Sequence, residues 1–358
     1  MNNIDQEVFR LANKYFNSDS YKNLKSESHI SFKLHRVIKH KDLDQYMLGK
    51  TKIYMDLNFW INLRNSIWKK SEDKRYFQLL EILKKKVKDK RIVCPFSNVL
   101  IEEVFKQDSK DSRLKTFQIA DILADKIMLS PMYYISMCEV HNLNSIYLGK
   151  QPTNLWYKWR RPINALGDFS LKTKKELSED ELLIKKVMYD INLQSSFQYV
   201  LGELDAASFI NKESSVWHAN MVNQSKAFSD PSGLSKKKLH RLEIRSSYKT
   251  IAKHIQSSVE VDVDSIIDHF SLSRLKEITP TCYAYSALYT ELILDRTRKI
   301  KPNDYYDIMH SSLALSTCDL FLTEKSFAST LKRMKIDKEF NVKVLFDIDE
   351  IIEIVESL

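Results

Sequence analysis

Short apolar runs near the two ends of this chain each finish on polar side chains. Residues 53–55 (Ile-Tyr-Met) are followed by Asp56, and residues 320–322 (Leu-Phe-Leu) by Thr323 and Glu324. Apolar runs of this length, bounded by polar residues, are typical of short buried strands. Two further strands are expected over residues 92–95 and 342–346.

Helical periodicity fills most of the remaining chain. Apolar residues recur at intervals of three and four, and the expected strands alternate with such segments. Strands that alternate with helices predict an α/β fold, in which a parallel sheet is flanked by helices. The segments expected to be helical are 71–90, 98–105, 111–129, 181–209, 280–298, 301–318 and 348–358, and a basic amphipathic helix is expected to begin at Ser235.

Composition narrows the class of protein. Five glycines in 358 residues leave no glycine-rich phosphate loop, which excludes the Walker and dinucleotide-binding fingerprints. The cysteines Cys94, Cys138, Cys282 and Cys318 lack the spacing of a zinc site, so reduced structural thiols are expected. No apolar run approaches the roughly 20 residues that span a bilayer, and the first residues lack the layout of a signal peptide. A cytoplasmic protein without membrane attachment is therefore expected.

The charge of the chain points to a polyanionic partner. A net charge of +9 and an isoelectric point near 9.0 suit binding to nucleic acid. Trp159, Arg160 and Arg161 place an aromatic ring beside two cations, which could stack on bases and clamp a strand. A packed turn with snorkelling cations explains the same three residues equally well.

Two further basic segments have alternative interpretations. Lys236, Lys237 and Lys238 open the amphipathic helix that begins at Ser235, where contact with phosphates and plain surface charge are balanced alternatives. The basic run over residues 33–41 is expected to be solvated surface.

Several acids stand inside or at the ends of apolar segments. Asp56 ends the first expected strand and opens directly into a helix, and Asp307 lies inside an apolar helix. Of Glu102 and Glu103, which interrupt another apolar run, one is expected to face solvent and the other the strand ends. A carboxylate on an apolar surface is costly unless something pairs with it, and the usual partner at such a position is a cation.

In this order, the acids resemble the site of the PIN-domain nucleases. Asp56 matches the first aspartate of that family, Asp307 matches its third acid, and Thr323 matches its hydroxyl residue. The second acid is expected to be Glu103, because the family tends to place an aliphatic residue directly after it; Glu102 stays open as the alternative. The expected last strand and helix also resemble the end of a PIN domain.

The resemblance implies a domain organisation. It covers residues 51–130 and 301–358, which would form the two parts of a PIN-like parallel-sheet core flanked by helices. Residues 131–300 would be a large helical insertion, and residues 1–50 an N-terminal helical extension. The chain has no internal repeat and no long low-complexity linker, so the insertion is expected to pack against the core.

The fourth acid departs from the family pattern. PIN domains often carry an aspartate two residues after the hydroxyl residue, a position that Lys325 occupies here. Asp319 and Glu324 are the alternatives, and they flank a three-residue strand that rises about 10 Å, so they cannot both bind one ion. Because Asp56 also follows a strand of the expected parallel sheet, Glu324 is favoured as the metal-side acid.

The resemblance implies a metal-dependent endoribonuclease. Carboxylates held together repel unless a divalent cation neutralises them, and oxygen ligands favour Mg²⁺ or Mn²⁺ over zinc. Such an ion activates water and stabilises a leaving oxygen. Asp56, Glu103, Asp307, Glu324 and Thr323 would form the site, with His310 at most in a supporting position.

The resemblance also suggests a context and leaves rival functions. A toxin or defence effector acting on RNA would fit the family. A non-catalytic RNA-binding or scaffold protein with a degenerate PIN fold is one alternative, and a structure-specific DNA nuclease is another. Whether the chain forms a homo-oligomer or has a regulatory partner is left open.

Overall fold

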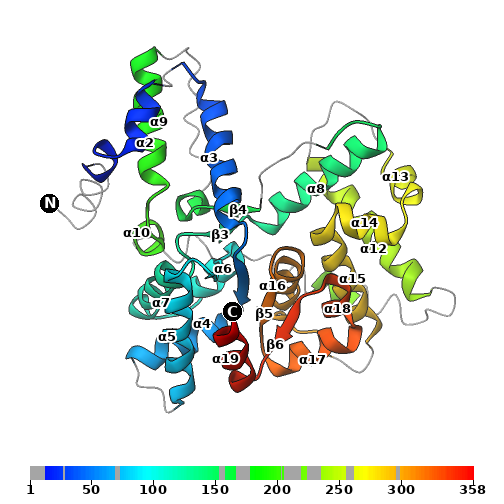
Figure 1. Cartoon of the computed structure of the whole chain (residues 1–358). Coiled ribbons are helices and arrows are strands. Elements are labelled where there is room, and N and C mark those ends of the chain that lie inside the picture. The colour runs from blue at the N-terminus through cyan, green and yellow to red at the C-terminus, as the bar shows by residue number, and fades with distance from the viewer. Residues whose placement is uncertain are drawn as a thin grey trace.

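Four short parallel strands lie at the centre of the computed structural model. They are β1 (Thr51–Met55), β2 (Ile92–Val93), β5 (Leu320–Leu322) and β6 (Lys343–Leu345), in the order β2-β1-β5-β6. The neighbours β1 and β5 come from opposite ends of the chain, with Ile53 beside Leu320 and Met55 beside Leu322 (Figure 1). The predicted α/β fold with a parallel sheet is confirmed.

The structure describes most of the chain. The described residues are 13–26, 29–68, 73–152, 158–166, 178–202, 204, 219–223, 235–254, 262–295 and 299–358.

Helices cover both faces of this sheet (Figure 1), which explains why the buried parts of its strands, such as residues 53–55 of β1, are apolar at successive positions rather than alternating. The side chains of Ile53, Tyr54 and Met55 are all completely buried. The helices that follow the strands in the first and last parts of the chain are α4 (Leu57–Trp68), α5 (Lys74–Lys88), α6 (Asn98–Phe105), α7 (Lys110–Leu123), α16 (Asp304–Thr317), α17 (Lys325–Met334), α18 (Ile336–Phe340) and α19 (Ile348–Ser357).

The prediction of one helix over residues 111–129 was wrong at its end. Helix α7 stops at Leu123, and Asp125 and Lys126 then adopt left-handed backbone angles, with φ of 49° and 57°. Two such residues in succession cannot continue a right-handed helix. The chain turns into strand β3 (Met128–Leu129), which lies beside Phe96 and pairs antiparallel with β4 (Trp159–Arg160).

The middle of the chain is helical and packs against the sheet-bearing part through α15. This helix contacts α16 on one side and α12 on another, so the expected packing of the middle segment on the rest is confirmed for this helix. The helical elements of this middle part are α8 (Met132–Tyr147), the 3₁₀ turn η1 (Pro162–Leu166), α9 (Glu179–Asn192), α10 (Phe197–Leu201), α12 (Lys236–His254), α13 (Val263–His269), α14 (Leu272–Ile278) and α15 (Pro280–Leu294).

The described part of the single helix expected over residues 181–209 is instead two helices, α9 and α10, and residues 203 and 205–209 lie outside the described residues. Ser196 caps the second one, and the partly buried carboxylate of Asp121 accepts hydrogen bonds from the backbone N–H groups of Phe197 and Gln198. A carboxylate that satisfies two first-turn N–H groups stabilises a new helix start. The long-range partner Asp121 explains why local periodicity missed this break.

The N-terminal helices α2 (Asp19–Ser26) and α3 (Phe32–Met47) pack on α9. At this contact the buried Asp190 carboxylate accepts from Tyr15 Oη at 2.7 Å, pairs with His35 Nε2 at 2.7 Å, and lies 3.1 Å from Lys39 Nζ. The prediction that the basic run 33–41 is solvated surface was therefore wrong for His35 and Lys39. The pattern of residues near His35 could not reveal this contact, because Asp190 lies 155 positions away in the sequence.

None of the helices in the described ranges combines the length and the apolar character that crossing a membrane requires.

Candidate functional site

Asp56 links the carboxyl ends of the two central strands. Its backbone N–H donates to Leu322 O at 3.0 Å. Its carboxylate accepts from the backbone N–H of Phe59 at 3.3 Å and from that of Glu324 at 3.1 Å. The residue is only 9% exposed, so the carboxylate is held at the sheet edge by both following segments.

The environment of Asp56 contains groups of both signs. Burial raises the pKa of its carboxyl to about 6, and the charge of Glu103 acts in the same direction. The hydrogen bond from the Thr323 hydroxyl and the nearby His310 lower this pKa and offset part of the increase. A carboxylate has about four lone-pair sites, and these N–H and O–H donors occupy about three of them. About one site is left for a further ligand.

A continuous chain of hydrogen bonds runs beside Asp56. Glu103 Oε2 lies 2.6 Å from His310 Nε2, and His310 Nδ1 lies 2.7 Å from Tyr54 Oη. Tyr54 Oη lies a further 2.7 Å from Ser97 Oγ. These hydrogen bonds thus connect α6, α16, β1 and Ser97, the residue that caps the start of α6.

The acids around His310 favour its charged form. Burial alone would lower the pKa of this imidazole, but the Glu103 carboxylate, assisted by the charges of Asp56 and Asp307, raises it above its ordinary value. An imidazolium beside several carboxylates relieves part of their mutual repulsion. The sequence predicted a supporting position at most, whereas the structure places His310 among three of the acids.

Tyr54 and Ser97 are site residues that sequence reasoning did not indicate, and Tyr54 was expected only as part of a buried strand. A signal was present for Tyr54, because a tyrosine inside a fully buried strand needs a partner for its hydroxyl. The partners themselves come from residues 43 and 256 positions away, which only the fold reveals.

Glu324 and Asp319 lie at opposite ends of β5. The Glu324 carboxylate is exposed and accepts a hydrogen bond from the Asn58 side-chain amide, two residues after Asp56. Asp319 instead accepts from the backbone N–H of Lys52 at 2.7 Å, and its carboxylate lies 3.6 Å from Lys52 Nζ. Of the two candidates for the fourth acid, only Glu324 therefore stands at the edge that carries Asp56.

The carboxylate oxygens at this edge are ligands that suit Mg²⁺ or Mn²⁺, but they are not already arranged around a single position. Within the described ranges, no group of three or more His, Cys, Asp or Glu side chains is arranged to hold one ion. Mg²⁺ usually keeps several waters and is held by only one or two carboxylates. The residues therefore suit a hydrated ion that binds through Asp56 and one neighbouring acid.

Trp159, Arg160 and Arg161 have structural partners. Trp159 and Arg160 are 7% and 8% exposed. Arg160 Nε donates to Ser130 Oγ at 2.8 Å, and its guanidinium lies 4.1 Å from the centre of the Tyr134 ring. Arg161 donates at 3.3 Å to two backbone carbonyls of the loop after α7. These contacts favour the packed-turn alternative over a nucleic-acid clamp.

The lysines at the start of α12 differ from one another. Lys236 Nζ forms an ion pair with Glu291 at 2.6 Å, whereas Lys237 and Lys238 are exposed. Surface pairs of this kind contribute little to stability, so Lys236 is not tied down strongly. Among the described residues, Lys237 and Lys238 have no ion-pair partner, and they place positive charge at the surface of this helix start.

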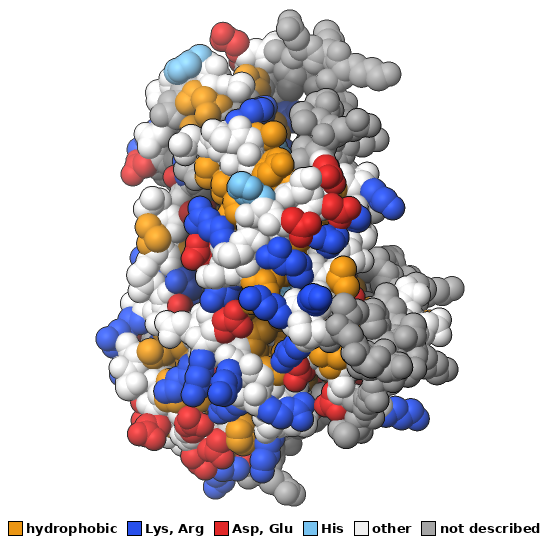
Figure 2. Space-filling model, turned by 90° about the vertical axis from the view of Figure 1, so that its right-hand side faces the viewer, with side chains coloured by type: hydrophobic (Ala, Val, Ile, Leu, Met, Phe, Trp, Pro, Cys, Tyr) orange, Lys and Arg blue, Asp and Glu red, His pale blue; other side chains and the backbone are white. Residues whose placement is uncertain are grey.

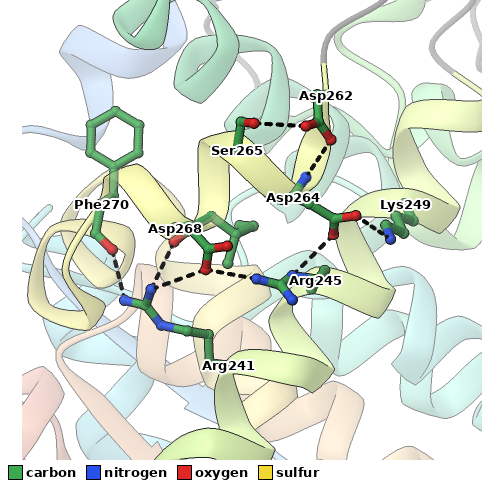
Figure 3. Close-up of polar contacts among 9 residues, drawn as sticks. Arg241, Arg245, Lys249, Asp262, Asp264, Ser265, Asp268 and Phe270 are labelled. Carbon is green, nitrogen blue, oxygen red and sulfur yellow. Dashed lines mark hydrogen bonds and ion pairs between the residues drawn. The ribbon is translucent and has the colours of Figure 1, made fainter.

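Farther along α12 the positive charges face acids of α13 (Figure 3). Arg245 lies 2.7 Å from Asp268, and Arg241 lies 3.6 Å from the same carboxylate. Lys249 Nζ lies 2.8 Å from Asp264. Arg241, Arg245 and Lys249 therefore have acidic partners, unlike the exposed Lys237 and Lys238 at the start of the helix.

A cation that sequence reasoning missed lies near the candidate site. Lys106 caps the C-terminal end of α6, three residues after Glu103, and its Nζ lies 3.7 Å from the ring centre of Tyr306, the residue before Asp307. The side chain is exposed.

On the face of the molecule that Figure 2 shows, lysines and arginines are densest in the lower half, with acids among them.

No protein-family model, curated protein or solved structure matches this chain. What the site can do is therefore inferred from its own residues.

Proposed function

We propose that this protein is a metal-dependent endoribonuclease built on a PIN-like core, with residues 131–300 as a helical insertion. One observation supports this most: Asp56 at the end of β1 is electrostatically coupled to Glu103 and to the His310 that Glu103 binds. Buried, mutually perturbed titratable groups at the carboxyl ends of parallel strands are characteristic of functional sites.

The acids have separate tasks in this proposal. Asp56, with Glu103 or Asp307, binds Mg²⁺ or Mn²⁺, and Glu324 reaches the same edge from the exposed side. When bound, the ion supplies an activated water and stabilises the leaving oxygen. Thr323 holds the Asp56 carboxylate in position through its hydroxyl, and His310 holds Glu103.

The preference for RNA rests on charge and on the resemblance to PIN domains. The chain carries a net charge of +9, and phosphate contacts by lysine and arginine supply most non-specific affinity for nucleic acids. We assign the nearest phosphate contact to Lys106 and outer contacts to Lys237 and Lys238. A cytoplasmic toxin or defence effector is the context that this activity fits.

A second candidate function is a non-catalytic RNA-binding protein with the same core. It is favoured by the 2.6 Å contact of His310 with Glu103, since an imidazolium at this position offsets negative charge that a metal ion would otherwise neutralise. Binding without cleavage would then depend on the surface lysines alone.

One experiment separates these functions. The purified protein is incubated with end-labelled single-stranded RNA and with DNA of the same sequence, in Mg²⁺, in Mn²⁺ and in EDTA. Cleavage of RNA that requires the metal supports the nuclease. Binding without cleavage under all conditions supports the second candidate, and cleavage of DNA in preference to RNA would reject the assigned substrate.

A further inference from the structure

A cavity of about 490 Å³ opens between α8, α12, α15 and α16. Cavities of this volume are large enough to hold a small organic molecule. Its wall includes Tyr133 of α8, Glu243, Ser246 and Thr250 of α12, Tyr285 and Tyr289 of α15, and Tyr305 of α16.

Tyrosine rings from three helices contribute to the wall of this cavity. Tyr285 and Tyr289 stand one helical turn apart on α15, and their rings are stacked at 5.9 Å with an angle of 24° between the planes. Tyr133 and Tyr305 add two more rings from other helices. The face of an aromatic ring carries negative charge density and attracts cations within about 6 Å.

Among the described residues that line the cavity, Glu243 is the one charged residue, and none is a lysine, arginine or histidine. Glu243 is partly buried, and burial raises the pKa of its carboxyl. Within the part of the chain that the structure describes, this carboxyl has no hydrogen-bond or ion-pair partner. A half-buried carboxylate is costly without a partner, so the cavity is prepared to receive a positive charge.

We propose that this cavity binds an organic monocation, namely a protonated amine or a quaternary ammonium group carried on a small apolar body. Glu243 pairs with the charged group, and the Tyr285 and Tyr289 rings contact both the cation and the apolar body. The serine and threonine hydroxyls of α12 supply hydrogen-bond acceptors for N–H groups. The negative charge of Glu243 repels phosphates and carboxylates, so this cavity is not expected to bind nucleic acid.

Three small molecules with the same aromatic body test this proposal. The probes are 2-phenylethylammonium, the neutral 2-phenylethanol and the anion phenylacetate, and binding to the full-length protein is measured by titration calorimetry at pH 8. We expect the ammonium compound to bind at least about tenfold more tightly than the alcohol, a difference of about 1.4 kcal/mol, and the anion to show no binding.

Variants locate the site. Glu243→Gln should weaken binding of the ammonium compound to the level of the alcohol, while Glu350→Gln, at an exposed position on α19, should leave it unchanged. Should Glu243→Gln fold poorly, Tyr289→Leu removes a ring face and should also weaken binding. Equal affinity for the ammonium compound and the alcohol, an unchanged Glu243→Gln, or no binding of the ammonium compound would each overturn the proposal.

Discussion

His310 Nε2 lies 2.6 Å from Glu103 Oε2, so that a single contact joins α16 to α6 beside Asp56. The other ring nitrogen of His310 lies 2.7 Å from Tyr54 Oη in the fully buried strand β1. One imidazole therefore fixes an acid of the candidate site to the centre of the sheet.

Removing this imidazole should affect both stability and cleavage. In His310→Leu the buried Tyr54 hydroxyl and the Glu103 carboxylate each lose a partner, so we expect a loss of about 1–3 kcal/mol in the free energy of unfolding. RNA cleavage per folded molecule should fall at least about tenfold, as when a residue that positions a metal ligand is removed. Urea unfolding and initial cleavage rates measure the two effects.

The matched control is His240→Leu. His240 is also buried, and its Nε2 lies 3.4 Å from the Tyr283 carbonyl, away from the acids. This variant should lose stability while keeping its cleavage rate per folded molecule. If both variants cleave at the wild-type rate, His310 does not position the site.

The two candidates for the fourth acid should behave differently. Glu324→Gln should raise the Mn²⁺ concentration needed for half-maximal cleavage, because Glu324 stands at the same strand edge as Asp56. Asp319→Asn should leave this concentration unchanged, because Asp319 bonds the start of β1 through Lys52. Cleavage rates of both variants are measured across a Mn²⁺ titration. If Asp319→Asn needs more Mn²⁺ than the wild type and Glu324→Gln does not, Asp319 is the fourth acid.

Lys106 should contribute to RNA binding through charge. If it contacts one phosphate, Lys106→Gln should make the slope of log affinity against log salt less steep by about 0.7, the value per contact for single strands. Binding is measured by fluorescence anisotropy between low and moderate salt. Lys110→Gln, at the exposed start of α7, is the control, and a similar change in both variants would remove Lys106 from the site.

Glu139 should make stability depend on pH. This completely buried carboxylate of α8 accepts the backbone N–H groups of Thr281 and Cys282 at 3.0 and 3.1 Å. Burial raises its pKa from 4.5 to about 7, against those hydrogen bonds and the Lys158 charge, which lower it. Between these pH values the folded protein retains a proton that the unfolded chain has released, so this group makes folding less favourable as pH rises.

The expected loss from pH 5 to pH 8 is about 2.5 kcal/mol in the wild type relative to Glu139→Gln. Glutamine cannot ionise, so the variant lacks this contribution at every pH. Free energies of unfolding from urea titrations at both pH values provide the measurement. Parallel pH dependence in the two proteins would show that the carboxyl titrates near its ordinary value.

The strands and their polar ends were predictable from the sequence for a physical reason. A strand segment buried on both faces is apolar at successive positions, so residues 53–55 of β1, 320–322 of β5 and 344–345 of β6 were recognisable. The alternation with helices then implied parallel strands. The shared edge of Asp56 and Glu324 follows from that geometry, and the 3.1 Å bond between them agrees with it.

The remaining features depend on contacts between residues far apart in the chain. Arg160 was ambiguous because its partner Ser130 lies across a strand pair that local patterning cannot foresee. Likewise, α7 ends at two left-handed residues that are not glycine, so the usual sign of a helix end was missing. The central place of His310 depends on how α16 packs against α6, and no spacing along the sequence encodes that.

The most direct test of the proposed nuclease compares two neighbouring acids on α6. Initial rates of RNA cleavage are measured for wild type, Glu103→Gln and Glu102→Gln in Mg²⁺, in Mn²⁺ and in EDTA. We expect wild type and Glu102→Gln to cleave at similar rates with metal and not at all in EDTA. Glu103→Gln should lose about 100-fold or more, equivalent to several kcal/mol of transition-state stabilisation. Metal-independent cleavage, or equal rates in Glu103→Gln and wild type, would contradict a metal-dependent site at this strand edge.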